Sequence, residues 1–118
     1  MSKPRFIIEQ DILIPRDEGN ISVGIRIGEP VLSEDKDGDT FWICPIQLQG
    51  LYDKLNPAGG LTSFGAMMHA LIGTYQLLDD VVGPKGKVIA LNLRTTEPHR
   101  PDDYITLKEL FQFGGIRR

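Results

Sequence analysis

The chain has 118 residues, of which 41% are hydrophobic and 25% charged, and its formal net charge is −3. This length and composition fit one compact domain over residues 1–118 and exclude wholesale disorder. The single cysteine, Cys44, excludes an intrachain disulfide scaffold and a cysteine-based zinc finger. Because charged residues, glycines and prolines interrupt every apolar run, we expect neither a membrane span nor a signal peptide, and we expect a cytoplasmic protein.

Three segments in the first half of the chain alternate apolar and polar residues, a pattern typical of β-strands. They are residues 6–14, residues 21–27 and residues 40–49. Pro45 lacks a backbone N–H, so it is expected at an edge, at a bulge or facing away from a neighbouring strand. The connections between the three segments are short and rich in turn residues, which favours antiparallel pairing.

Residues 62–82 are predicted to form a long helix, and either Thr62 or Ser63 can accept a hydrogen bond from its first free amides. Large apolar residues recur along it at spacings of three and four. We expect them to be its buried face: Phe64, Met67, Met68, Leu71, Ile72, Tyr75, Leu78 and Val82. A neighbouring stripe of smaller residues, from Ala66 to Leu77, would allow close approach to a sheet or a second helix.

The remaining segments complete an α+β prediction. Residues 51–60 read as a loop and residues 88–93 as a fourth strand. Thr106 and Glu109 have the spacing of a capping box, which predicts a short helix that ends at Gly114, and a strand over residues 104–111 is the alternative. The expected fold is a three- or four-stranded antiparallel sheet with the long helix packed on one face and a short C-terminal helix.

One candidate ligand site lies where the long helix begins. Gly59, Gly60 and Ser63 could present backbone amides to an anion, although a turn followed by a helix cap is the favoured interpretation. His69 and His99 would have to converge with this loop to serve a small-molecule binder or a small enzyme. The acidic segment 33–39 lacks the ligand spacing of a calcium loop and is interpreted as a solvated hairpin turn. We therefore predict no catalytic residue, no metal site and no cofactor.

A second candidate site is the face of the sheet that the long helix leaves uncovered. Several residues lie on the side of their strands opposite to the predicted buried side, and we expect these residues to face a protein partner or a second copy of the chain: Ile7, Leu13, Phe41, Ile43 and Gln47.

Nucleic-acid binding is disfavoured. Residues 84–118 carry a net charge of +3, but their basic residues are interspersed with acidic ones.

The runs Arg26-Ile-Gly-Glu-Pro-Val31, Trp42-Ile-Cys-Pro-Ile-Gln-Leu-Gln-Gly-Leu51 and Ala58-Gly-Gly-Leu-Thr-Ser-Phe-Gly-Ala66 resemble a family of small bacterial proteins defined as a domain of unknown function. The resemblance covers about residues 5–82. It implies a bacterial cytosolic setting, and it supplies neither an activity nor functional residues. The leading hypothesis is a non-enzymatic protein-interaction or regulatory module that can form a homodimer through its sheet, and the alternative is the small-molecule binder or enzyme described above.

Overall fold

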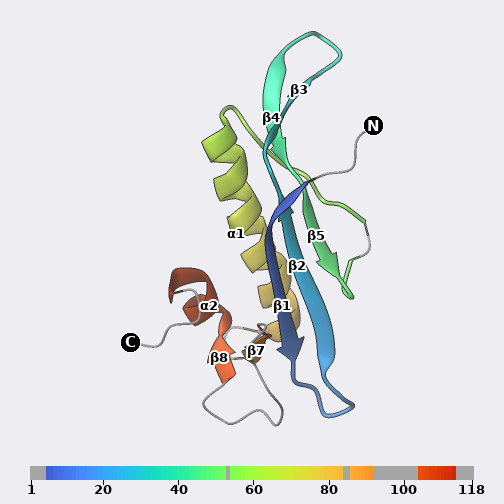
Figure 1. Ribbon diagram of the computed structural model, residues 1–118, viewed down its shortest axis with the longest axis vertical. Coiled ribbons are helices and arrows are strands. Elements are labelled where there is room, and N and C mark those ends of the chain that lie inside the picture. The colour runs from blue at the N-terminus through green and yellow to red at the C-terminus, as the bar shows by residue number, and fades with distance from the viewer. Residues whose placement is uncertain (1–4, 53, 84–85, 92–103, 114–118) are drawn as a thin grey trace.

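The computed structural model describes residues 5–52, 54–83, 86–91 and 104–113 (Figure 1). A five-stranded antiparallel sheet has the order β5-β2-β1-β7-β8, and a three-stranded antiparallel sheet has the order β3-β4-β6. The elements in chain order are β1 (Phe6–Ile14), β2 (Ile21–Gly28), β3 (Val31–Glu34), β4 (Thr40–Cys44), β5 (Ile46–Gln49), β6 (Ala58–Gly60), α1 (Ser63–Val82), β7 (Lys87–Leu91), β8 (Tyr104–Thr106) and α2 (Leu107–Phe113). The α+β class is confirmed, with more strands than the three or four expected.

The core lies against the apolar faces of β1 and β2, as their alternation predicts. Ile12 pairs with Val23 in the β1–β2 register, and both side chains are fully buried. The polar break in this pattern, Gln10, lies where the pairing of β1 with β7 ends. Its side-chain amide donates to the carbonyl oxygens of Leu91 at 2.7 Å and Asp11 at 2.8 Å. Gln10 therefore satisfies main-chain acceptors at the end of a strand pair.

Pro45 divides the segment that we predicted as one strand over residues 40–49. β4 before it belongs to the three-stranded sheet, and β5 after it belongs to the five-stranded sheet. Proline offers no N–H to continue a ladder, whereas its carbonyl still accepts from the N–H of Gly28 at 2.8 Å. The prediction of a single strand was therefore wrong. The prediction of a loop over residues 51–60 was also incomplete, because β6 forms at its end and pairs with β4.

The acidic segment between β3 and β4 is a hairpin turn, as predicted. One carboxylate oxygen of Asp35 accepts from the N–H groups of Asp37 at 2.9 Å and Asp39 at 3.0 Å. Gly38 has a φ of 86°, a left-handed value that glycine adopts without a steric cost. The carboxylate of Asp35 thus stabilises the turn itself.

Helix α1 runs alongside β1 and β2, from the level of β4 to that of β7 (Figure 1). Its N-cap is Thr62, whose hydroxyl oxygen accepts from the N–H of Gly65 at 2.9 Å. Gly83 ends the helix with a φ of 86°, and its N–H donates to the carbonyl of Asp79 at 2.8 Å. The helix predicted over residues 62–82 is confirmed.

The buried face of α1 differs from the one predicted. Four residues spaced four apart are buried, and we call them the inner stripe: Ala66, Ala70, Thr74 and Leu78. The hydroxyl of Thr74 donates to the carbonyl of Ala70 at 2.7 Å, so its burial leaves no unpaired polar group. Of the eight residues predicted as the buried face, Leu78 is buried, and Met67, Leu71, Tyr75 and Val82 pack against the core in partly buried positions. The prediction was wrong for Phe64, Met68 and Ile72, which are exposed. Ala66 and Ala70 let the first half of the helix lie close to β4 and β6, and the exposed large side chains lie on the other side of the helix.

The capping box before α2 is confirmed. The carboxylate of Glu109 accepts from the N–H of Thr106 at 3.1 Å, and the hydroxyl of Thr106 accepts from the N–H of Glu109 at 3.1 Å. The alternative of a strand over residues 104–111 holds only for the three residues of β8. Phe111 of α2 meets Tyr75 of α1 edge to face, with ring centroids 5.3 Å apart, which joins the two helices.

Thr62 and Ser63 provide a matched test of the α1 cap. Replacing Thr62 with alanine should lower the free energy of unfolding by about 1 kcal/mol, because the N–H of Gly65 loses its acceptor. Replacing the exposed Ser63 with alanine should change it by less than about 0.5 kcal/mol. Urea unfolding followed by circular dichroism measures both values. Equal losses in the two variants would contradict the assignment of Thr62 as the cap.

Candidate functional site

Three large apolar side chains are exposed on the face of α1 opposite to the core, and a fourth lies just before the helix begins. We call them the outer stripe: Leu61, Phe64, Met68 and Ile72. Their exposed fractions are 90%, 74%, 40% and 49%, in that order. Phe64, Met68 and Ile72 are spaced four apart and therefore share one helix face. An exposed apolar patch of this kind is typical of a contact surface for another molecule.

A groove between α1 and α2 lies next to the outer stripe. It has a volume of about 650 Å³ and is lined by Met68, Leu71, Ile72, Tyr75, Gln76, Lys108 and Phe111. A smaller cavity of about 220 Å³ shares the walls formed by Leu71 and Phe111 and reaches the inner face of β1 and β2. The outer stripe and the groove therefore form one largely apolar surface along the two helices.

The loop predicted as a ligand site is used for packing at several of its residues. A Cβ atom on Gly60 would lie 2.4 Å from the backbone nitrogen of Ala66, so Gly60 is where β6 and α1 meet most closely. Gly59 lies in β6, and its carbonyl is 2.6 Å from Nδ1 of His69. Because a carbonyl only accepts, Nδ1 of His69 carries the proton in this contact. Ser63 is the exposed first residue of α1.

The structure describes only one of the two histidines on which the enzyme hypothesis depends. His69 ties α1 to β6, whereas His99 lies outside the described residues. Among the described residues, no group of three or more histidine, cysteine, aspartate or glutamate side chains is placed to hold a metal ion. The contacts of His69 and Gly60 are those of a structural junction.

The five residues predicted on the uncovered face of the sheet lie in β1, β4 and β5. Ile7 is 50% exposed at an irregularity in the β1–β2 register. The other four are half-buried: Leu13, Phe41, Ile43 and Gln47. The guanidinium of Arg26 lies in β2 opposite Gln47 and pairs with the carboxylates of Asp11 at 2.8 Å and Glu9 at 3.6 Å. Ion-paired polar groups therefore lie on the part of this face that β1, β2 and β5 form.

Cys44 is buried, and its thiol donates to the carbonyl oxygen of Gly28 at 3.1 Å. Burial raises the pKa of the Cys44 thiol, because the thiolate is poorly solvated there. As the pH rises, the unfolded chain loses this proton first. The contribution of Cys44 to stability is therefore complete below the ordinary thiol pKa of about 8.5 and declines above it.

We expect Cys44 to be unreactive in the folded protein. A water-soluble disulfide reagent near pH 8 should label it only as fast as the chain unfolds, and adding denaturant should give full labelling at once. Cys44→Ala provides the background for the assay. Rapid labelling without denaturant would contradict the buried environment.

The described part of the chain contains no helix with the length and apolarity needed to cross a membrane. Its fold and surfaces define a small α+β protein with two antiparallel sheets and one long helix whose outer side is apolar. No family model, no curated protein and no solved structure matches the chain significantly.

The outer stripe contains residues that the sequence pattern identified and assigned to the core. The signal that could have placed them outside is the second, smaller stripe from Ala66 on the same helix. Small side chains permit close packing, so a second stripe of small residues beside the large one leaves two candidate buried faces on this helix.

Proposed function

We propose that this chain is a non-enzymatic protein-interaction module of the bacterial cytoplasm and that the outer stripe is its contact surface. The observation that carries the proposal is the exposure of Leu61, Phe64, Met68 and Ile72 together. Leaving one large apolar side chain in water is common, but a continuous group of them is unfavourable unless a partner covers it.

The charge of α1 supports an apolar protein contact. From Ser63 to Leu78 the helix contains no aspartate, glutamate, lysine or arginine. A neutral surface of this kind gives phosphate groups little to bind, whereas the cores of protein interfaces are depleted of charge and enriched in aromatic residues and methionine. The uncovered sheet face is a less favourable contact surface, because the ion pairs of Arg26 would have to be desolvated there.

Photo-crosslinking in the native host cells tests this function. A benzophenone amino acid that replaces Phe64 should give discrete adducts with a partner protein, because this side chain is 74% exposed within the stripe. The same amino acid at Leu55 is the control, since Leu55 is also exposed and adjoins Asn56, whose backbone forms hydrogen bonds with Ile46 of β5. Adducts absent at position 64, or the same at both positions, would overturn the proposal.

A further inference from the structure

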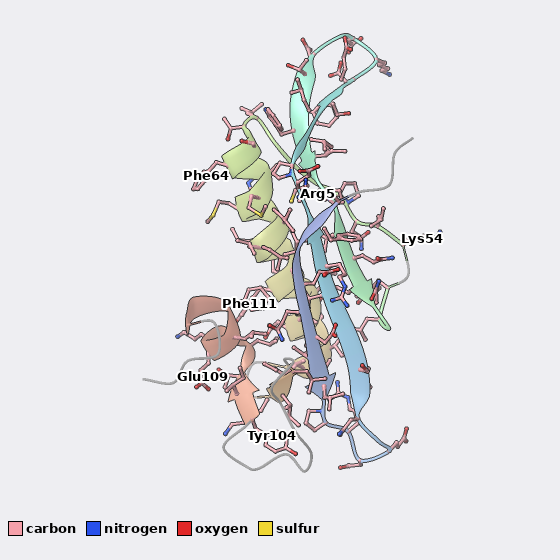
Figure 2. The ribbon with its side chains drawn as sticks, viewed as in Figure 1. Arg5, Lys54, Phe64, Tyr104, Glu109 and Phe111 are labelled. Atoms are coloured by element: carbon pink, nitrogen blue, oxygen red, sulfur yellow. The ribbon has the colours of Figure 1, made fainter. Side chains whose placement is uncertain are left out.

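The helical surface contains both projecting side chains and a groove that could receive them. Leu61 and Phe64 project at the N-terminal end of α1, and the groove with Phe111 lies toward its other end. In Figure 2, Phe64 points away from the sheets, and Phe111 lies farther along α1, between that helix and α2. Met68 lies between the two and borders the groove.

These features are spaced symmetrically about Met68. Phe64 and Ile72 are each four residues from it, which corresponds to about 6 Å along the helix axis. Leu61 and Tyr75 are each seven residues from it. A two-fold axis at Met68 would place Phe64 of one copy opposite Ile72 of the other, and Leu61 opposite Tyr75. The projecting side chains of each copy would then meet the groove of its partner, as in an isologous interface.

The charges along this surface permit such a contact. Because α1 has no charged side chain from Ser63 to Leu78, two copies that pack along this stretch bring no like charges together. Lys108 is the charged residue of the groove, and among the described residues it forms no ion pair. Its ammonium group would approach the ring of Phe64 from the second copy, where a cation–π contact is favourable.

The exposed area is sufficient for a weakly associating dimer. A large apolar side chain presents on the order of 200 Å², so the exposed fractions of the outer stripe amount to roughly 500 Å² on each copy. If the contact buries all of this area, two such surfaces give roughly 1,000 Å² in total, which is about the minimum for a specific interface and is typical of a transient one. The groove walls add to this area. We therefore expect a dissociation constant of about the micromolar order.

We propose that the partner of the outer stripe is a second copy of this chain, packed antiparallel along α1 on a two-fold axis at Met68. This inference rests on the proposed function and specifies its partner. It places Phe64 and Leu61 of each copy in the α1–α2 groove of the other.

Sedimentation velocity over a concentration series tests the dimer. The wild-type chain should change from monomer to dimer across the micromolar range. Phe64→Glu should remain monomeric at every concentration, because a dimer of this variant would bury an unpaired glutamate from each copy in the interface. Leu55→Glu is the matched control and should dimerise like the wild type, since Leu55 is exposed outside the stripe and adjoins Asn56, which is bonded to β5. Thermal unfolding of each variant at low concentration verifies that it folds.

Cysteine cross-linking tests the antiparallel arrangement. Met68→Cys should oxidise to a covalent dimer, because residue 68 lies on the axis. Phe64→Cys alone should not, whereas an equal mixture of Phe64→Cys and Ile72→Cys chains should cross-link to each other. The native Cys44 is buried and serves as the unreactive background.

The outcomes separate this inference from the proposed function. A wild-type chain that stays monomeric at all concentrations, or a dimer that Phe64→Glu leaves intact, overturns the second copy as partner. Cross-linking of Phe64→Cys to itself overturns the antiparallel arrangement. If the chain is monomeric while position 64 gives adducts with a different protein in cells, the proposed function stands and only the identity of the partner is wrong.

Discussion

Replacing Gly60 with alanine should destabilise the protein by at least about 3 kcal/mol, which would lower its melting temperature by roughly 10 °C or more. The added Cβ atom would lie 2.4 Å from the nitrogen of Ala66 and 2.7 Å from the carbonyl carbon of Gly65. Both atoms belong to the backbone of α1, so relief of the clash requires the helix to move away from β6. Chemical unfolding monitored by circular dichroism measures the loss.

Gly59 provides the control for this substitution. The nearest atom to a Cβ on Gly59 is the carbonyl oxygen of Trp42 at 3.9 Å, an ordinary contact distance, and its φ is not left-handed. Gly59→Ala should therefore change the free energy of unfolding by less than about 1 kcal/mol. Similar values for the two alanine variants would show that α1 does not lie as close to β6 as the structure places it.

Replacing Leu78 with alanine should lower the free energy of unfolding by about 2–5 kcal/mol. Leu78 belongs to the inner stripe and is fully buried in the core. Removal of its side chain loses apolar burial and leaves a cavity between α1 and the sheets. Because the total stability of a domain is about 5–15 kcal/mol, this single change would remove a large part of it.

The matched variant on the same helix is Ile72→Ala in the outer stripe. Ile72 is 49% exposed, so we expect a loss below about 1.5 kcal/mol when unfolding is measured at low protein concentration. At high concentration the proposed dimer would add to the difference between this variant and the wild type. A larger loss for Ile72→Ala than for Leu78→Ala at low concentration would mean that α1 is rotated relative to the structure described.

The two predictions concern one structural arrangement. Gly60 allows α1 to approach β6, and the inner stripe of α1 is small enough at Ala66 and Ala70 to use that approach. Met67 and Leu71 still pack partly against the core beside this stripe. Phe64, Met68 and Ile72 remain exposed, and this exposure is the basis of the proposed interaction surface.

Local patterns in the sequence were sufficient to predict the longest elements and the start of the last helix. The alternation in residues 6–14 and 21–27 predicted β1 and β2, and the predicted helix over residues 62–82 matches α1. The spacing of Thr106 and Glu109 predicted the start of α2, because a capping box needs only two residues three positions apart. The helix and the capping box depend on interactions within a few residues along the chain, and β1 and β2 are consecutive strands that pair with each other.

Other features depended on which segments meet in three dimensions. Pro45 moves the strand that follows it into a different sheet, and β6 exists only because residues 58–60 pair with β4. The candidate site has the same origin. The sequence by itself determined that α1 has two apolar stripes, but hydrophobic periodicity cannot rank one stripe above the other. Only the tertiary structure decided which side is buried, because the packing of α1 against the sheets fixes the rotation of the helix about its axis. Ala66, Ala70, Thr74 and Leu78 are buried, whereas Phe64, Met68 and Ile72 are exposed.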